Sequence, residues 1–253
     1  MIRFDREGRV GVATIDRTER RNALDATHCD ELRAALAEHR DLLAVVVTGA
    51  GSAFCAGADL GTRFADGGGR GADTFRPAFE RVLDAIVDHP VPVIAAIHGP
   101  AIGAGMQLAV ACDIRVAGPD ARLSIPGGRL GILLSPTNIA RLATLVGQGA
   151  ARDFLLTGRS VDAAGGATIG LVQRLADDPV AAARALAHEI ALLAPLTVRG
   201  HKRALNLVAA AAALGPEARR EIDALEAAAF ASHDLEEGMA AFAEKRTPRF
   251  EGR

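Results

Sequence analysis

The sequence predicts an α/β fold in which helices cover a parallel β-sheet. Residues 93–97 form an unbroken apolar run, which is typical of a strand covered on both faces, and residues 44–48 (AVVVT) predict another buried strand. The segment between them repeats apolar side chains with helical spacing, at Phe75, Phe79, Val82, Leu83 and Ile86. A strand, a helix and a second strand make up the right-handed crossover unit of a parallel sheet.

The elements on either side of this unit follow from local signals. Residues 2–4 and 10–15 alternate apolar and polar side chains, which predicts a hairpin with one solvated face. Asp25 is expected to cap a helix with an apolar stripe at Leu32, Ala35 and Leu36. Later patterns predict a strand at 114–117, a loop at 118–138 and helical stretches at 139–146 and 150–156. A short helix capped by Asp162 and a last strand at 171–172 are expected to follow.

The composition changes near Pro179, after which alanine dominates and three or four helices are expected up to Glu244. No linker rich in Gly, Ser or Pro marks the change. We therefore interpret residues 1–180 as a core and residues 181–253 as a helical subdomain that does not fold independently.

Composition excludes several classes of partner. The formal net charge of −2 over 253 residues gives no electrostatic footprint for nucleic acid. No long apolar run and no signal-peptide pattern occurs, so we expect a cytoplasmic protein that does not insert into membranes. Cys29, Cys55 and Cys112 are odd in number and lie in apolar surroundings, so we expect buried thiols and neither a disulfide nor a metal site.

Two turns with very small side chains follow the two buried strands. The first covers residues 49–60 and the second includes Gly103, Ala104 and Gly105, which open a predicted helix. Such a turn directs free amides, at the positive end of a helix dipole, toward an anion or a polarised oxygen. Plain helix packing is an alternative, and a dinucleotide site is a weaker one because Leu108 replaces the third glycine of that fingerprint.

The segments 52–60 (SAFCAGADL) and 98–113 (HGPAIGAGMQLAVACD) resemble the two signature segments of the crotonase, or enoyl-CoA hydratase/isomerase, superfamily. Residues 17–24 and 242–250 extend the resemblance over nearly the whole chain. It implies the crotonase fold, a superhelix of repeated β-β-α turns with a C-terminal helical trimerisation region. The expected assembly is a homotrimer or a dimer of trimers.

The resemblance also implies a site. In the family, amides at the positions of Ala58 and Ala104 bind the oxygen of a coenzyme A thioester, so acyl-CoA or enoyl-CoA is the expected ligand and no other cofactor is implied. Further contacts to coenzyme A are expected from residues around Ala58, from an N-terminal loop and from the last segment: Ala56, Asp59, Leu60, Arg20, Arg21, Phe242 and Lys245. The last two are expected to reach a neighbouring subunit's ligand.

Several of these residues also have structural interpretations. Arg20 and Arg21 could be a solvated surface pair, and Lys245 could be a solvated lysine on a last helix. Asp59 could hold its loop by accepting backbone hydrogen bonds. His98 is more readily interpreted as a hydrogen-bonded structural histidine than as a general base.

Hydratases of this superfamily use two glutamates, and here their positions are Gln107 and Gly127. A carboxamide has no proton to exchange near neutral pH, and glycine has no side chain. Ser135 stands where some relatives carry another acid, and Asp113 is expected to be structural. Asp66 and Asp73, in a glycine-rich segment at 61–73 expected to be mobile, could fold over the pocket.

The favoured hypothesis is therefore a protein that binds fatty acyl-CoA with little or no hydratase activity. Ile125, Leu130 and residues 132–134 are expected to form an apolar wall that favours a long or bulky acyl chain. The alternative is an active enoyl-CoA hydratase or isomerase that uses an acid from a mobile loop or an ordered water. A third hypothesis is a different reaction on an acyl-CoA enolate, with Gln107 and Ser135 positioning the substrate.

Overall fold

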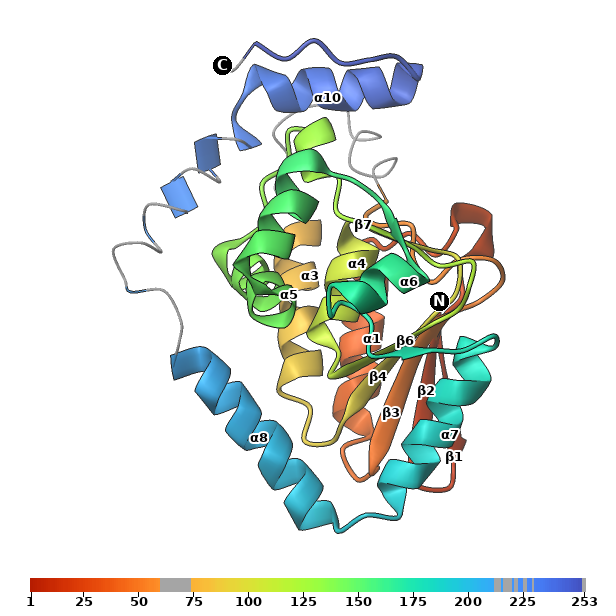
Figure 1. Cartoon of the computed structure of the whole chain (residues 1–253). Coiled ribbons are helices and arrows are strands. Elements are labelled where there is room, and N and C mark those ends of the chain that lie inside the picture. Colours follow the sequence, from red (N-terminus) through yellow and green to blue (C-terminus); the bar gives the residue numbers. More distant parts are fainter. Residues whose placement is uncertain are drawn as a thin grey trace.

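The structure is a computed structural model that describes residues 1–59, 74–211, 215, 220, 223–224, 227–228 and 230–251. Its centre is a six-stranded sheet in the order β1-β2-β3-β4-β6-β9 (Figure 1). The strands are β1 (Ile2–Glu7), β2 (Val10–Ile15), β3 (Ala44–Gly49), β4 (Val93–Ile97), β6 (Ile114–Ala117) and β9 (Arg174–Leu175). Within this sheet of the described residues, β1 and β2 pair antiparallel and every other neighbouring pair is parallel. The predicted fold class is confirmed.

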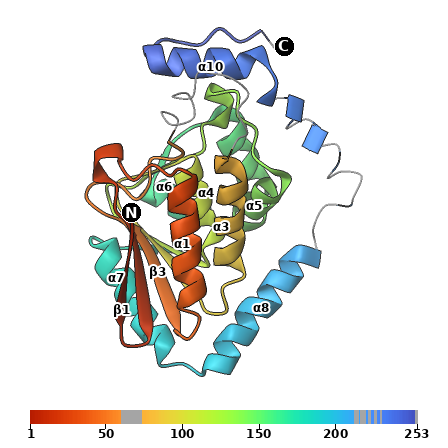
Figure 2. The same cartoon turned by 180° about the vertical axis from the view of Figure 1, so that it is seen from behind.

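Helices cover both faces of this sheet. On one side lie α1 (Ala26–Glu38), which Asp25 caps as predicted, and α3 (Phe75–Val87), seen in front of the sheet in Figure 2. On the other side α7 (Pro179–Ala191) packs on β2, β3, β4 and β6. Ala183, Leu186 and Ala187 of α7 contact Val10 and Val12 of β2 in one buried cluster.

This cover explains one wrong prediction. The hairpin of β1 and β2 exists, but every residue of β2 is buried, so its second strand has no solvated face. The alternation is confined to residues 2–5 of β1, where half-buried and exposed residues alternate. A helix more than 160 residues further along the chain covers the second face of β2, and no local pattern in the hairpin indicates this.

A smaller sheet and four short helical elements complete the upper half of the molecule in Figure 1. The sheet consists of β5 (Pro100–Ile102), β7 (Arg122–Ser124) and β8 (Val161–Asp162). The helical elements beside it are α4 (Ala104–Ala111), α6 (Ala163–Thr168), and the 3-10 turns η1 (Thr18–Arg20) and η2 (Gly127–Arg129). Neither β5 nor β7 was predicted, because strands of three residues carry too little pattern.

Two predictions at the end of the core have different outcomes. The two predicted helical stretches are parts of α5 (Pro136–Thr157), which is interrupted at Gly147 with φ 76° and ψ 160°. The predicted strand at 171–172 is wrong. Leu171 and Val172 are buried in the core, whereas the last strand is β9, two residues further on.

The C-terminal region contributes α8 (Pro195–Ala211) and α10 (His233–Glu244), so the described part of the chain agrees with the predicted helices. Lys202 fastens α8 to the core: its buried ammonium donates to the carbonyl oxygens of Ile86 and Val91 and pairs with Asp113 at 2.7 Å. Asp113 is therefore structural, as expected. The division of the chain at residue 180 stays a prediction.

α10 lies across the top of the molecule in Figure 1. It packs on the loop after η2 through two glycines, because a Cβ on Gly131 would lie 2.8 Å from Leu235 Cα and one on Gly238 would lie 2.8 Å from the Leu130 carbonyl carbon. Helix and loop thus touch backbone to backbone. This contact places the last helix of the chain beside its own core.

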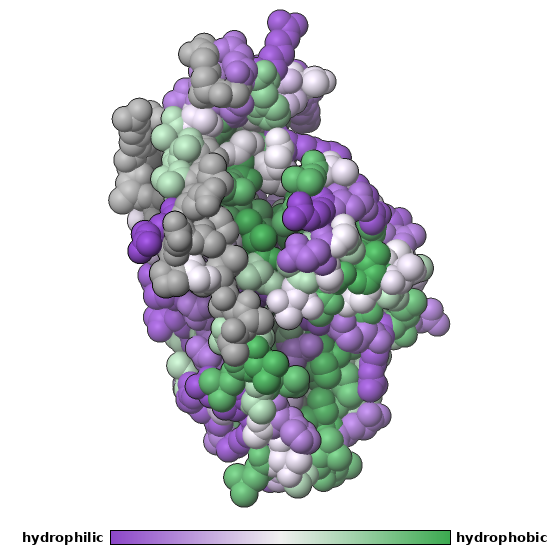
Figure 3. Space-filling view, turned by 60° about the vertical axis from the view of Figure 1, so that its left-hand side comes forward, coloured by the Kyte–Doolittle hydropathy of each residue, from purple (hydrophilic) through white to green (hydrophobic). Residues whose placement is uncertain are grey.

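Hydrophobic side chains remain exposed where α7 turns into α8, at the lower end of the molecule in Figure 3. Leu192 and Leu196 are 88% and 86% exposed. Among the described residues, no single helix is long and apolar enough to cross a membrane, and α7 with α8 reaches that length and composition only jointly, across a bend of 113°.

Candidate functional site

The two small-residue turns meet in the structure. The Cys55 amide donates a 3.0 Å hydrogen bond to the Pro100 carbonyl oxygen, and the Ile102 amide donates one of 3.0 Å to the Cys55 carbonyl oxygen. Gly105 lies so close that a Cβ on it would be 2.2 Å from the Cys55 oxygen. Glycine is therefore required at position 105 for the two backbones to approach each other.

This contact brings Ala58 and Ala104 to the wall of one cavity. Ala104 is the first residue of α4, so its amide has no partner inside the helix and lies at the positive end of the helix dipole. On either side of Ala58, the Leu24 amide donates to Gly57 and the Asp59 amide donates to Leu24. Within the described part of the chain, neither the Ala58 nor the Ala104 nitrogen donates a hydrogen bond.

Arg17 and Asn22 hold the Ala58 turn in place, and sequence reasoning missed both. Arg17 forms a 2.6 Å ion pair with Asp59, which is only 9% exposed. Asn22 is fully buried with φ 59°, and its side-chain nitrogen donates to the carbonyl oxygens of Ala50 and Ala53 at 2.8 Å and 2.6 Å. Asparagine tolerates this left-handed conformation, which was the available signal in the segment 17–24.

The cavity encloses about 970 Å³, including its part open to solvent. Ala56, Gln107, Gly127 and Phe242 line it together with the two alanines, so six of the predicted site residues surround one space. The whole predicted apolar wall is also there, and three phenylalanines add to it. These apolar residues are Ile125, Leu130, Ile132, Leu133, Leu134, Phe75, Phe79 and Phe230.

Gln107 and Gly127 lie at the cavity on different elements. Gln107 is half-buried on α4, one turn beyond Ala104. Gly127 begins η2, and a Cβ on it would lie 2.5 Å from the backbone oxygen of Ile132. Because a backbone atom cannot rotate away, a larger side chain at position 127 requires the loop itself to move.

Glu80 is a carboxylate on the cavity wall that sequence reasoning missed. It lies on α3 and is half-buried. Asn138 of α5, which is 4% exposed, donates a 2.9 Å hydrogen bond from its side-chain nitrogen to Glu80 Oε1. The available signal was that Arg76 and Glu80 directly follow Phe75 and Phe79 on the buried side of the helix.

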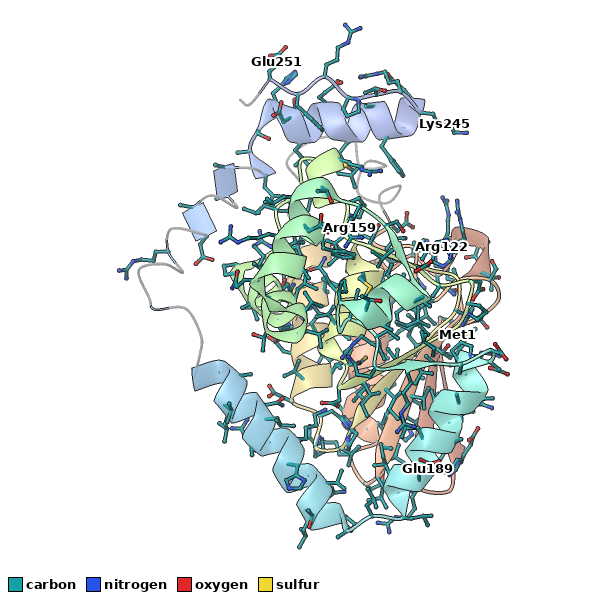
Figure 4. All side chains as sticks on the ribbon, viewed as in Figure 1. Met1, Arg122, Arg159, Glu189, Lys245 and Glu251 are labelled. Atoms are coloured by element: carbon teal, nitrogen blue, oxygen red, sulfur yellow. The ribbon has the colours of Figure 1, made fainter. Side chains whose placement is uncertain are left out.

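Other predicted site residues do not line the cavity. Arg20 and Arg21 are exposed, although the Arg21 carbonyl oxygen accepts a 3.0 Å hydrogen bond from the Ala56 amide at the wall. Lys245 is exposed at the outer end of α10 (Figure 4). Leu60 lies outside the described residues, as do Asp66 and Asp73.

Ser135 and His98 have positions that limit their chemistry. Ser135 caps α5 by accepting a 3.4 Å hydrogen bond from the Asn138 amide. Both ring nitrogens of His98 are buried without a hydrogen-bond partner in the described residues, and the ring does not line the cavity. His98 is thus placed as a buried structural residue away from the cavity wall, while the hydrogen bond expected for its ring stays a prediction.

The thiols lie in the core, as expected, and all three cysteines are free and buried. Burial raises the pKa of Cys55 and of Cys112 to about 12 and also raises the pKa of Cys29. Such thiols are poor nucleophiles and metal ligands near neutral pH. In the described ranges no three His, Cys, Asp or Glu side chains are grouped so that they could hold a metal ion.

Comparison with known proteins agrees with this geometry. A family model described as enoyl-CoA hydratase/isomerase matches residues 5–253. The chain belongs to the enoyl-CoA hydratase/isomerase family. A relative in Mycobacterium leprae named "Probable enoyl-CoA hydratase echA6" is 41% identical over 253 residues and is covered to 96%, as is this chain.

Solved structures of other proteins share the fold. An enoyl-CoA hydratase/isomerase from Pseudoalteromonas atlantica T6c superposes with a TM-score of 0.84 at 31% identity, covering 99% of both chains. A methylmalonyl-CoA decarboxylase in complex with 2-nitronate-propionyl-CoA has a TM-score of 0.91 at 22% identity, covering 100% of this chain and 98% of that one. At such low identity, this second likeness concerns the fold alone.

Proposed function

We propose that the chain binds fatty acyl-CoA thioesters in this cavity, with the thioester oxygen between the amides of Ala58 and Ala104. The observation that carries the proposal is that both residues line one cavity and that neither amide donates a hydrogen bond within the described part of the chain. A pair of backbone donors that is preorganised around one point stabilises a polarised carbonyl oxygen or an enolate oxygen.

The walls support an acyl group as the ligand. Most side chains around the cavity are aliphatic or aromatic, from α3, from the loop after η2 and from Phe242 of α10. Burial of apolar surface contributes about 0.8 kcal/mol for each methylene group. A long acyl chain therefore binds more tightly than a short one, up to the length that the cavity accepts.

Hydration by two glutamates is not available to this chain. Gln107 cannot exchange a proton, and the backbone around Gly127 leaves no space for a carboxylate. A positioned acid or base contributes about 10²- to 10⁴-fold to a rate, so hydration is expected to be weak although binding persists.

The coenzyme A portion lies toward Arg20 and Arg21. Their loop is tied to the cavity wall by the hydrogen bond from Ala56 to Arg21, and both side chains are exposed. Exposed guanidinium groups are suited to phosphate oxygens. Lys245 is the third candidate cation, and its side chain lies at the far end of α10.

A homotrimer or a dimer of trimers is the proposed assembly, with α8 in the interface. Leu196, Leu205 and Val208 of this helix are 86%, 69% and 71% exposed. Light scattering on purified protein should give a mass three or six times that of the chain, and Leu205→Glu should lower it. A monomer at micromolar concentration would contradict this part of the proposal.

An active hydratase or isomerase is the second candidate function, and Glu80 is the observation that favours it. A carboxylate at the wall of an acyl pocket could exchange a proton with the ligand. This source differs from the expected mobile loop, whose residues lie outside the described part of the chain.

Calorimetry and absorbance together test the first function. Hexadecanoyl-CoA and crotonyl-CoA would be titrated into the protein, and loss of the conjugated-thioester absorbance of crotonyl-CoA and trans-2-hexadecenoyl-CoA would be followed separately. We expect tight binding of the long chain with slow hydration. Hydration of either enoyl-CoA at the rate of ordinary hydratases would refute the non-hydrating proposal, and no binding of any thioester would refute the site.

A further inference from the structure

The side chains of α3 that face the cavity include one acid. Phe75, Arg76, Phe79 and Glu80 all line the cavity, and their spacing places them on one side of the helix. Arg76 stacks on the Phe230 ring at 5.1 Å. Glu80 is therefore the one carboxylate among the described residues that line this space.

The orientation of the Glu80 carboxylate is set by a chain of hydrogen bonds. Arg141 donates from Nη1 to Asn138 Oδ1 at 2.9 Å and pairs through Nη2 with Asp84 at 2.7 Å. A guanidinium group can only donate, so the amide oxygen of Asn138 must face Arg141 and its NH₂ group must face Glu80. Glu80 is thus the acceptor of this bond.

This arrangement leaves Glu80 with acceptor capacity. Asn138 occupies Oε1, and within the described part of the chain Oε2 receives no hydrogen bond and the carboxylate forms no ion pair. A glutamate that served only to join two helices would need no more than the first oxygen. A carboxylate that lines the cavity, is oriented by a neutral amide and keeps one oxygen without a hydrogen bond from the described residues has the features of a positioned base.

Gln107 is the polar residue of α4 on the same cavity as Glu80. Gln107 and Asn138 line one small cleft between α4 and α5, together with Val110, Ile125 and Leu142. Gln107 also lines the acyl cavity with Glu80. Helix α4 thus presents an amide, Gln107, to the cavity, and the carboxylate on the same cavity comes from the adjacent helix α3.

We propose that Glu80 is a catalytic base that removes an α-proton from a bound acyl-CoA. The α-carbon–hydrogen bond breaks, its electron pair forms the carbon–carbon double bond of the enolate, and the carbonyl π electrons move to the oxygen held by the Ala58 and Ala104 amides. The proton goes to a Glu80 oxygen, and the reverse step returns a proton to the α-carbon. Asn138 and Arg141 are positioning residues.

This inference rests on the proposed binding of acyl-CoA in the same cavity, but it adds an activity that binding alone does not need. It also explains how the chain could act on an acyl-CoA without the two glutamates of hydration. An enolate is formed by one base and an oxyanion site, and no water has to be activated.

Hydrogen–deuterium exchange tests the proposal without any hydration step. Hexanoyl-CoA, which has no double bond to hydrate, would be incubated with the protein in D₂O, and the incorporation of deuterium at the α-carbon followed by mass spectrometry. Calorimetry with the same ligand gives the affinity independently. We expect the wild-type protein to exchange up to two α-protons and to bind the ligand.

Glu80→Gln is the decisive variant. A glutamine oxygen can still accept the Asn138 hydrogen bond, so the variant removes the proton acceptor and keeps the link between the helices. Exchange should fall by about 100-fold or more while the dissociation constant changes little. Asp88→Asn is the matched control, because it makes the same chemical change at an exposed residue at the end of α3, and it should exchange like the wild type.

Two further variants separate catalysis from structure. Glu80→Asp keeps a carboxylate and should retain measurable exchange, and Asn138→Ala should lower the exchange rate without weakening binding. Equal exchange in Glu80→Gln and the wild type overturns the assignment, as does a wild-type protein that binds hexanoyl-CoA but exchanges nothing. A wild-type protein that binds no thioester overturns the proposed function and this inference with it.

Discussion

The Ile132 amide donates a 3.0 Å hydrogen bond to the Gly127 carbonyl oxygen, while the carbonyl oxygen of Ile132 lies only 2.5 Å from where a Cβ on Gly127 would be. The backbone of the loop after η2 thus packs directly on Gly127. The conformation of this loop requires glycine at position 127, so an acid could not be placed there by exchanging one side chain alone.

Adding a side chain at position 127 should therefore destabilise the protein. Gly127→Ala places a Cβ against the Ile132 oxygen and should cost about 1–3 kcal/mol in the free energy of unfolding. Gly128→Ala is the matched control, since a Cβ there meets no atom within 4 Å. Urea unfolding would compare the two, and equal stabilities would mean that the loop adapts freely.

Gln107→Glu alone should raise hydration of crotonyl-CoA. It restores one proton-exchanging group at the cavity wall without touching the Gly127 loop, and a gain of about tenfold or more is expected because one such group contributes about 10²- to 10⁴-fold in established enzymes. Initial rates of absorbance loss measure the effect. An unchanged rate, with binding intact, would show that position 107 does not face the double bond.

Ala104→Pro should weaken acyl-CoA binding by about fivefold. Proline is tolerated at the first position of a helix but has no amide hydrogen, so the variant removes one proposed donor, and a net hydrogen bond contributes about 1 kcal/mol. Ala26→Pro makes the same change at the first residue of α1, away from the cavity. Calorimetry should detect weaker binding in Ala104→Pro only, and equal affinities would remove the Ala104 amide from the site.

Asn22→Gly should lower both stability and acyl-CoA affinity. Glycine accepts the φ of 59°, so the loss arises from the missing side chain, which leaves the Ala50 and Ala53 carbonyl oxygens without their donor, at a cost of about 2 kcal/mol. Arg21→Gly is the control for stability, because Arg21 also has a positive φ but is exposed. Its unfolding midpoint should be equal to or above that of the wild type.

His89 should make the protein less stable in acid. Burial lowers the pKa of His89 to about 4, from 6.5, so below pH 6.5 the unfolded chain binds a proton that the folded state does not. This contribution is complete above pH 6.5 and is lost as the pH falls toward 4, by about 2 kcal/mol at pH 5.

Urea unfolding of His89→Leu and the wild type at pH 8 and pH 5 tests this linkage. The variant should lose less stability than the wild type on acidification, whatever its absolute stability. His201→Leu changes an exposed histidine of α8 and should leave the pH dependence unaltered. A parallel decline of all three proteins would assign the acid sensitivity to other groups.

Much of the fold was open to prediction because its signals are local. The apolar runs of β3 and β4, the helical repeat of α3 and the caps at Asp25 and Asp162 each depend on residues within a few positions of one another. The three-residue strands β5 and β7 were missed because such strands exist only through pairing with distant segments.

The same difference between local and long-range signals decides which parts of the site could be predicted. The small residues around Ala58 and Ala104 are visible in the sequence, because only a backbone with small side chains can approach a ligand oxygen. The lack of an acid at positions 107 and 127 is visible too, because an acid is either present or not. Glu80 was missed because its role depends on Asn138, 58 residues further along the chain.

The sequence by itself determined the crossover unit, the two turns of small residues and the lack of acids at positions 107 and 127. Only the tertiary structure decided that β2 is buried on both faces, that Gly127 is sterically required and that the Glu80 carboxylate lies at the wall of the cavity. The physical reason is range: hydrogen bonding and hydrophobic periodicity along one segment are local, whereas burial, steric contact and the convergence of side chains depend on segments that only folding brings together.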